Sequence, residues 1–276
     1  MAAMPDRRWV YYLSMKIEKI SWEKDGLNIR GELYLPKRGS SGPFPGLIVC
    51  HGIPAKGKEP GDRGYPSLAE SFCRQGFEVL IFNFRGAGWS EGNFDILGWA
   101  RDLEGGLDFF IHRPEVDPAR IFLLGFSGGA AVSIYVTARR TEISALVSCA
   151  SPAEFQDLLG GQGRIDFLSH CRDVGIIKDS KFPVSLDEWT DGFRIVQPLD
   201  WVERIPPRPF LIIHGKKDDI VDVSHAGNLY DRVRGKAELF LIAEAGHRLR
   251  MEERAMHKAM EWLGKIAFSS PPSVIG

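Results

Sequence analysis

One serine, two aspartates and one histidine each follow an apolar run of the chain, where that run gives way to a polar loop. Ser127 lies in GFSGG, Asp218 and Asp219 lie in HGKKDDIV, and His247 lies in AGH. A serine hydroxyl becomes a good nucleophile when a histidine removes its proton and a carboxylate orients that histidine. These residue types predict nucleophilic catalysis, with Ser127 as the attacking group, His247 as the base and one of the two aspartates as the acid.

The residues around Ser127 predict a sharp turn between a buried strand and a helix. Ile121–Phe126 is an apolar run of the length that suits a buried parallel strand, and apolar residues from Ala130 onward recur at helical spacing. Gly125 and Gly129 leave room for such a turn. The pattern is also typical of an ordinary Gly-Ser turn, so the interpretation of Ser127 depends on the other two loops.

Two backbone N–H groups are expected to stabilise the negative charge that develops when a serine attacks a carbonyl group. One belongs to Gly128, next to the serine, and the other to Ile53, in the loop after the apolar segment GLIVCHG. His51 in that segment is expected to fix the loop rather than to react.

The composition is that of an ordinary globular protein. The 276 residues carry a formal net charge of −1, with 26% charged and 44% hydrophobic residues. A near-neutral chain gives no electrostatic reason to expect a nucleic acid or an anionic membrane as a partner. No apolar run is long enough for a signal-peptide core or a membrane span. The oligomeric state does not follow from the sequence.

The cysteines and histidines give no sign of a disulfide framework or of a bound cofactor. None of the four cysteines forms a C-x-x-C pair, which fits a reduced, cytoplasmic protein. The histidines and acids lack the paired spacing of metal ligands, so no metal is expected. Gly52–Lys58 approaches a phosphate-binding loop, but Glu59 stands where that loop needs Ser or Thr, which argues against a nucleotide.

The order of the expected elements predicts an α/β fold. Met15–Lys24 and Leu27–Pro36 flank Asp25-Gly26, which is a hairpin signal. After this hairpin, apolar strands alternate with amphipathic helices. The alternation predicts a mostly parallel eight-stranded sheet with helices on both faces, and in such sheets sites form at the carboxyl ends of the strands.

Residues 152–206 interrupt this alternation and predict a small inserted cap, because they are rich in glycine, aspartate and aromatic residues and their helical patches are short. The predicted core is then 15–151 and 207–268, with tails at 1–14 and 269–276. Four aromatic side chains are candidates for the apolar walls of a substrate pocket, although each could equally belong to the core: Phe126, Trp89, Trp189 and Phe193.

Taken together, these motifs resemble those of serine esterases of the α/β-hydrolase superfamily. The resemblance covers roughly residues 15–268 and rests on CHG at 50–52, NFRGAGWSEG at 83–92, GFSGG, HGKKDDIV and AGH. The layout is similar to that of bacterial feruloyl/cinnamoyl esterase-like hydrolases, which also carry a small insertion before the acid. In that family the acid lies in an HG-x-x-D motif, which implies that Asp218 is the acid here. Asp219 is the alternative. Phe126 and Gly128 stand where relatives often have His and Gln, which weakens any transfer of substrate identity.

The residues and the resemblance predict a serine carboxylesterase that hydrolyses short-chain or aromatic carboxylic esters through an acyl-enzyme on Ser127, without a cofactor. The expected partner is a small-molecule ester. A serine peptidase or amidase and an acyltransferase remain alternatives, because one fold hosts many activities. A non-catalytic binding protein would be expected to lack the serine, the histidine or the acid, and the sequence lacks none of them.

Overall fold

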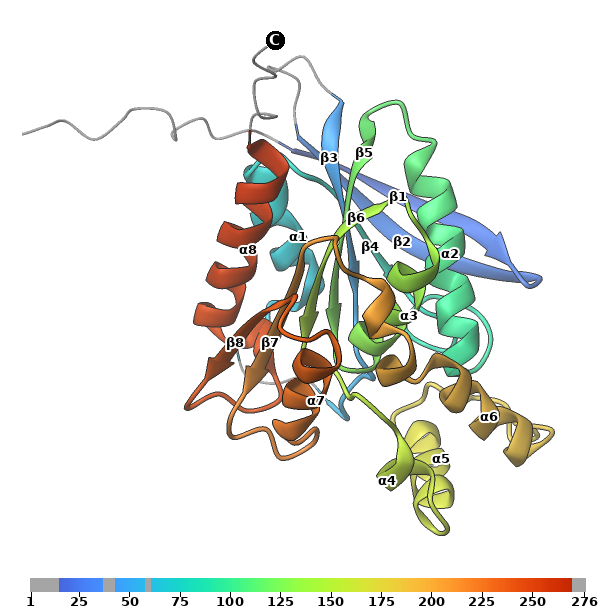
Figure 1. The fold of residues 1–276 in the computed structure, drawn as a ribbon. Coiled ribbons are helices and arrows are strands. Elements are labelled where there is room, and N and C mark those ends of the chain that lie inside the picture. Colours follow the sequence, from blue (N-terminus) through green and yellow to red (C-terminus); the bar gives the residue numbers. More distant parts are fainter. Residues whose placement is uncertain (1–14, 37–42, 58–60, 270–276) are drawn as a thin grey trace, which may run out of the picture.

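A mixed sheet of eight strands forms the centre of the structure. The computed structural model describes residues 15–36, 43–57 and 61–269, and places the strands in the order β1-β2-β4-β3-β5-β6-β7-β8 (Figure 1). The strands are β1 (Met15–Lys24), β2 (Leu27–Pro36), β3 (Phe44–Cys50), β4 (Glu78–Asn83), β5 (Val116–Phe126), β6 (Ile143–Cys149), β7 (Phe210–Gly215) and β8 (Glu238–Ile242). The tail predicted at 1–14, and that at 269–276 apart from Ser269, lie outside the described residues.

The sheet is parallel apart from its first hairpin. β2 pairs with both β1 and β4 in antiparallel register, whereas the other five pairings are parallel. The hairpin turns at Asp25 and Gly26, whose φ angles of 55° and 71° lie in the left-handed region that a tight hairpin turn requires. Both hairpin strands have the bounds that the sequence predicts, because the turn residues and the alternation of apolar side chains fix the same register.

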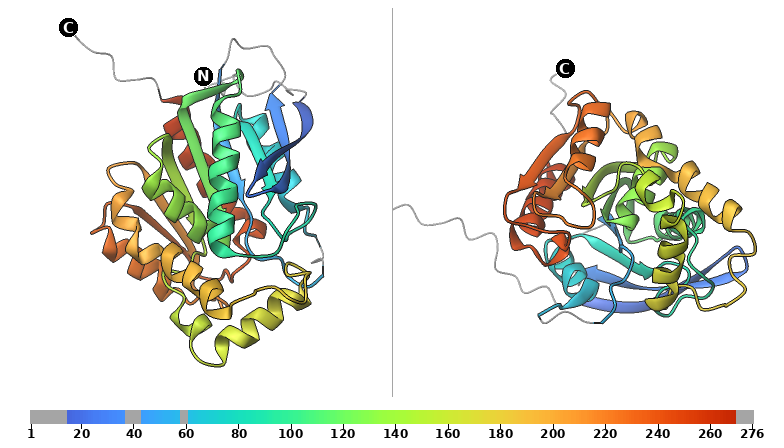
Figure 2. Two further views of the ribbon diagram at one scale, coloured as in Figure 1. Left: turned by 90° about the vertical axis from the view of Figure 1, so that its right-hand side faces the viewer. Right: turned by 90° about the horizontal axis from the view of Figure 1, so that it is seen from below.

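Helices cover both faces of the sheet, as the views of Figures 1 and 2 show. One face carries two helices and the other carries three. The first two are α1 (Gly64–Arg74) and α8 (Glu253–Phe268), and the other three are α2 (Ile96–Ile111), α3 (Gly128–Arg139) and α7 (Ser224–Arg232). Within the described part of the chain, no helix is long and apolar enough to cross a membrane.

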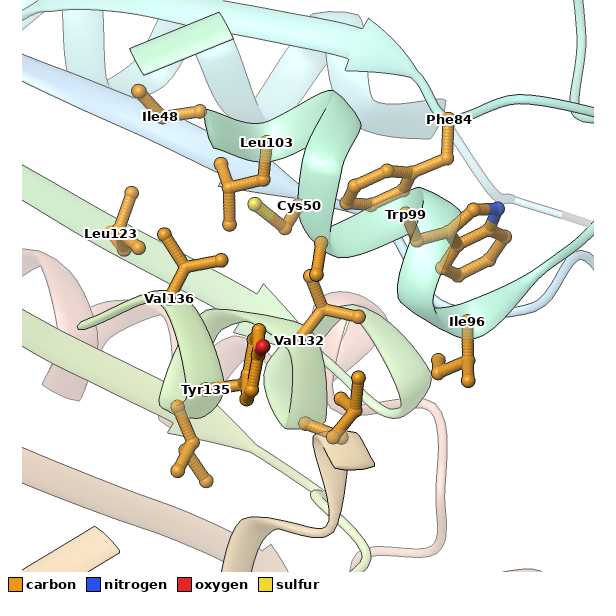
Figure 3. Close-up of a cluster of buried hydrophobic side chains, with 14 of the residues drawn as sticks. Ile48, Cys50, Phe84, Ile96, Trp99, Leu103, Leu123, Val132, Tyr135 and Val136 are labelled. Carbon is orange, nitrogen blue, oxygen red and sulfur yellow. The ribbon is translucent and has the colours of Figure 1, made fainter. Parts of the chain in front are cut away.

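Each face of the sheet has its own hydrophobic core. Because side chains alternate along a strand, Ile48 and Cys50 of β3 point toward α2 and α3, in the cluster drawn in Figure 3. Leu47 and Val49 point to the opposite face, toward α1 and α8. β3 is therefore buried on both sides, as the uninterrupted apolar run in its sequence predicts.

The chain between β6 and β7 first covers the carboxyl edge of the sheet. It then returns to the opposite edge, where the parallel strand β7 begins. Three helices lie beyond the carboxyl edge, at the bottom of Figure 1. They are α4 (Gln156–Leu159), α5 (Gly163–Asp173) and α6 (Leu186–Val196). The chain then returns through two short 3-10 helices, η1 (Pro198–Asp200) and η2 (Val202–Arg204), which pack against α3 and α7.

Candidate active site

Ser127 lies on a strained turn between β5 and α3. Its φ and ψ angles are 51° and −124°, a conformation that few residues other than glycine adopt. The turn needs glycine on both sides. A Cβ atom on Gly129 would lie 2.2 Å from the carbonyl oxygen of His51, and one on Gly125 would lie 2.6 Å from the Cα of Ala130. The two glycines of the motif therefore allow the close packing that lifts Ser127 out of the sheet.

The side chains of Ser127, His247 and Asp218 form one hydrogen-bonded chain. Ser127 Oγ lies 2.9 Å from His247 Nε2, and His247 Nδ1 lies 2.8 Å from Asp218 Oδ2. An ionised carboxylate can only accept, so Nδ1 carries the hydrogen in the neutral ring and Nε2 offers its lone pair to the serine hydroxyl. The three residues come from loops after β5, β8 and β7, which meet at the carboxyl edge of the sheet.

Asp218 is held as an anion by several donors. The backbone N–H groups of Val221 and Ile220 donate to its Oδ1 at 2.8 and 3.0 Å, and His214 Nε2 lies 3.2 Å from its Oδ2. Burial acts to raise the pKa of Asp218, but the hydrogen bonds from His214, His247 and Val221 outweigh it and hold the pKa well below its usual range. Asp219 is exposed to solvent, so Asp218 is the aspartate that the structure brings to His247.

His214 gives Asp218 a second imidazole partner. The ring is fully buried, and its Nε2 also donates to the carbonyl oxygen of Val221 at 2.8 Å. Because a carbonyl oxygen accepts only, Nε2 carries a hydrogen. Nδ1 is buried, and no described residue pairs with it. His214 therefore holds in place both the carboxylate of Asp218 and the backbone of the loop that carries it.

His51 braces the loop that carries Ile53. Its Nδ1 donates to the carbonyl oxygen of Gly52 at 2.7 Å, and its Nε2 accepts from the backbone N–H of Phe84 at 3.0 Å. Burial lowers the pKa of His51 to about 4, so the ring is neutral at physiological pH. As predicted, the imidazole fixes the loop and does not reach the serine.

Ile53 and Gly128 lie side by side next to the serine. A Cβ atom placed on Gly128 would lie 3.7 Å from Cγ1 of Ile53, and one on Gly52 would lie 2.9 Å from the Cβ of Ser127. No acceptor in the described part of the chain pairs with the backbone N–H of Ile53 or Gly128. Both amides are therefore free to donate to a ligand beside the serine hydroxyl.

Ser127 and His247 open into a cavity of about 1140 Å³ between the strand ends and α5. Two of the four aromatic residues predicted as pocket walls, Phe126 and Trp89, line this cavity. The other two, Trp189 and Phe193, do not line it.

Trp189 and Phe193 belong instead to a buried aromatic cluster between α6 and the core. They are 4% and 1% exposed, and the indole N–H of Trp189 donates to the carbonyl oxygen of Phe94 at 3.0 Å. The rings of Phe94 and Phe167 pack against both of them. The two residues lie four apart on the apolar face of α6, and that face turns toward the core. Phe167 is the ring of this cluster that reaches the cavity.

Comparisons with known proteins identify the fold. A family model described as alpha/beta hydrolase fold matches residues 45–169. An acylaminoacyl peptidase from Pyrococcus horikoshii superposes with a TM-score of 0.70 at 17% identity, over 95% of this chain and 43% of the peptidase. The esterase Pf2001 from Pyrococcus furiosus superposes with a TM-score of 0.63 at 24% identity, over 92% of this chain and 90% of the esterase. This protein has the α/β-hydrolase fold.

Among relatives of similar sequence is the uncharacterized protein YfhR of Escherichia coli. It is 26% identical over 230 residues, which are 81% of this chain and 70% of YfhR. None of these three proteins is described as a feruloyl or cinnamoyl esterase, so the narrower resemblance seen in the sequence stays a prediction.

The α/β-hydrolase fold also brings to the cavity side chains that the sequence analysis did not select. Tyr65 packs edge-on against Phe126, with ring centroids 5.8 Å apart, and the guanidinium of Arg250 lies 4.7 Å from the centre of the Tyr65 ring. Arg250 also forms an ion pair with Asp62. Asp62 and Tyr65 lie at the start of α1, whereas Arg250 lies far away in the sequence between β8 and α8, and no motif or periodicity links them. Among the described residues, no cluster of histidine, cysteine or acidic side chains could hold a metal ion.

Proposed function

We propose that this protein is a serine hydrolase that cleaves carboxylic esters with short-chain or aromatic acyl groups through an acyl-enzyme on Ser127. The observation that carries the proposal is the hydrogen-bonded chain from Ser127 Oγ through His247 to Asp218, with distances of 2.9 and 2.8 Å. A nucleophile, a base and an orienting acid in this geometry are the groups that acyl transfer needs.

The proposed reaction has two halves. His247 Nε2 takes the proton of the serine hydroxyl while Oγ attacks the ester carbonyl, and the backbone amides of Ile53 and Gly128 donate to the oxyanion. The imidazolium then gives its proton to the departing alcohol, which leaves an acyl group on Ser127. Water activated by His247 hydrolyses that acyl-enzyme. Asp218, held ionised by its donors, stabilises the imidazolium in both halves.

The acyl preference rests on the walls of the cavity near the serine. Phe126, Tyr65 and Phe167 present aromatic rings to it. Flat aromatic groups pack well against such rings, and short acyl chains fit beside them. A small-molecule ester is the expected partner. The four buried cysteines are free thiols, which supports the expected reducing, cytoplasmic compartment.

Replacement of the nucleophile tests this proposal directly. We expect Ser127→Ala to lower the turnover of p-nitrophenyl acetate and of a cinnamate ester by roughly 10⁴-fold or more, with an unchanged unfolding temperature. A fluorophosphonate should add covalently to Ser127 of the unaltered protein, as mass spectrometry of its peptides would show. Ser21→Ala, at an exposed serine of β1, is the matched control. Turnover by Ser127→Ala within tenfold of the parent would refute the assignment.

Amide hydrolysis is the second candidate, favoured by the structural likeness to an acylaminoacyl peptidase. An ester and an amide with the same acyl group and similar leaving groups separate the two activities. We expect the larger kcat/KM on the ester, whereas faster cleavage of the amide or of peptides would assign a serine peptidase. Transfer of the acyl group to an added alcohol, in preference to water, would assign an acyltransferase.

A further inference from the structure

One set of side-chain contacts connects two loops that carry groups of the candidate active site. The oxyanion loop (residues 51–53) follows β3 and contains Ile53, the expected oxyanion donor. The base loop (residues 247–251) follows β8 and contains His247, the expected base. The two loops meet at the start of α1, where the Arg250 side chain of the base loop packs on Tyr65 and pairs with Asp62.

Tyr65 holds the oxyanion loop at Gly52. The backbone N–H of Gly52 donates to the Tyr65 hydroxyl in a long hydrogen bond of 3.4 Å, and the carbonyl oxygen of Gly52 accepts from His51 Nδ1 at 2.7 Å. That carbonyl shares a planar trans peptide unit with the N–H of Ile53, and the two groups of such a unit point in opposite directions. The contacts on both sides of Gly52 therefore set the direction in which the Ile53 N–H points.

Arg250 holds the base loop. It lies in the short 3-10 helix η3 (Leu249–Met251), and the backbone N–H of Leu249 donates to the carbonyl oxygen of His247 at 2.8 Å. A shift of this helix therefore moves the base. The Arg250 side chain is only 17% exposed and that of Asp62 is 22% exposed, so their ion pair is screened by salt much less than a surface pair.

The two side chains at the start of α1 are held by contacts of their own. Asp62 Oδ1 accepts from the backbone N–H of Gly64 at 2.6 Å, while its Oδ2 pairs with Arg250. The Tyr65 ring packs edge-on against Phe126, the last residue of β5. The connection therefore reaches the strand that precedes the nucleophile as well as both loops.

We propose that Tyr65 and Arg250 are positioning residues that hold the oxyanion loop and the base loop at a fixed separation across the serine. This inference rests on the proposed esterase activity. The reaction needs the Ile53 N–H at the carbonyl oxygen and His247 at the proton of Ser127 at the same moment, and small displacements at a reacting centre cost much of the rate. A displacement of one loop from the other weakens binding of the transition state and leaves binding of the unreacted ester nearly unchanged.

Substitutions at two points of the connection test the proposal. Arg250→Met removes the charge and keeps an apolar stem, and we expect kcat on p-nitrophenyl acetate to fall roughly 10- to 100-fold while KM stays within about threefold. Arg250→Lys keeps a positive charge beside Asp62 and should recover part of the loss. Tyr65→Phe keeps the ring beneath the guanidinium and removes only the acceptor for the Gly52 N–H, so we expect kcat to fall roughly tenfold.

Phenylboronic acid separates a positioning role from a purely structural one. Its boron bonds to a serine hydroxyl and forms a tetrahedral adduct that resembles the transition state. The inhibition constant should therefore rise in Arg250→Met and in Tyr65→Phe by about the factor by which kcat falls. In the double variant, the loss of kcat should be smaller than the product of the two single losses, because both substitutions break the same connection.

Arg140→Met is the matched control. Arg140 pairs with Asp108 and Glu142, its side chain is 21% exposed, and it does not line the cavity. This variant should unfold at a lower temperature but keep the parental kcat and inhibition constant below that temperature. Parental values in both Arg250→Met and Tyr65→Phe, or an equal loss in Arg140→Met, would refute the positioning role while the esterase activity stands. Failure of the unaltered protein to hydrolyse any ester would refute the proposed function itself.

Discussion

Two buried carboxyl groups at opposite ends of the sheet have very different surroundings. Asp218 follows β7 at the carboxyl edge and is 8% exposed, while Glu78 begins β4 at the other edge and is 0% exposed. Asp218 receives hydrogen bonds from two imidazoles and two backbone amides. Neither carboxyl oxygen of Glu78 has a hydrogen-bond partner among the described residues.

Burial acts to raise the pKa of both groups, but the resulting shifts have opposite signs. For Glu78, burial and the nearby carboxylates of Glu115 and Glu18 raise the pKa to about 7, against the opposing effect of Arg113. For Asp218, hydrogen bonds outweigh burial and lower the pKa. The comparison shows that hydrogen-bond donors, and not the extent of burial, decide whether a buried carboxyl group is charged in this protein. At the candidate site they provide the anion that His247 requires.

Removal of the charge at Asp218 should have the largest effect. Asp218→Asn keeps the shape of the side chain but can hold His247 in the wrong tautomer, so we expect kcat to fall by roughly 10³- to 10⁴-fold. Steady-state kinetics on p-nitrophenyl acetate provide the measurement, and thermal unfolding would check that the variant is folded. A loss smaller than tenfold would show that His247 does not depend on this acid.

Removal of the second imidazole from Asp218 should have a smaller effect on activity. His214→Leu deletes one buried hydrogen bond to a charged group, and we expect kcat to fall roughly 10- to 100-fold with little change in KM. His214→Gln, whose amide can place a donor near the position of Nε2, should recover part of the loss. Equal kinetics for the Leu and Gln variants would contradict a role for the Nε2 donor.

The carboxyl group of Glu78 should affect stability and leave the chemistry unchanged. The unfolded chain releases this proton near the ordinary pKa of 4.5, whereas the folded protein keeps it up to about pH 7. Stability should therefore fall as pH rises from about 4.5 to 7 and then stay low. Glu78→Gln mimics the protonated group, so we expect it to raise the free energy of unfolding by about 2–3 kcal/mol at pH 8 and to change it little at pH 4.5.

Urea denaturation at the two pH values measures this difference. Glu23→Gln, at an exposed glutamate of β1, should give the same change at both pH values. An equal effect of Glu78→Gln at pH 4.5 and pH 8 would mean that folding does not raise the pKa of Glu78.

The smallest effect is expected at the aspartate next to the acid. Asp219 is exposed, and its neighbour Asp218 already occupies the position at His247. Asp219→Asn should therefore change kcat/KM by less than about threefold, within the range of exposed substitutions. A larger loss than that of Asp218→Asn would mean that the acid is misassigned by one residue.

Where local chemistry decides a feature, the sequence predicts it well. The Asp25-Gly26 turn fixes the first hairpin, and the apolar run of β3 marks a strand that is buried on both faces. The loops with serine, aspartate and histidine converge because the carboxyl ends of parallel strands meet at one edge. Applying that rule requires only the order of strands and helices along the chain, and no knowledge of how the side chains pack.

Features that depend on contacts distant in the sequence were harder to predict. Residue types alone left Asp218 and Asp219 as alternatives, because the choice is made by His214 and by the amides that shape the loop. The sequence leaves Trp189 and Phe193 as candidates for either the pocket wall or the core, and the structure places both in the core. Their spacing of four residues on α6 already indicates a face that packs on the core.

The path of the chain from β6 to β7 limits how this protein could be redesigned. Trp201, between η1 and η2, packs edge-on against Tyr135 of α3 with ring centroids 4.8 Å apart, and Val202 and Ile205 are fully buried in the core. A graft that replaces α4 and α5 (156–173) with other helices would change the wall of the cavity that Phe167 forms, and would leave α6 and the return segment in place. A deletion that joins β6 directly to β7 would also remove the return segment and expose apolar surface of α3 to solvent. New substrate ranges are therefore accessible by exchanging the helices over the cavity, provided that the return segment from Pro198 onward stays with the scaffold.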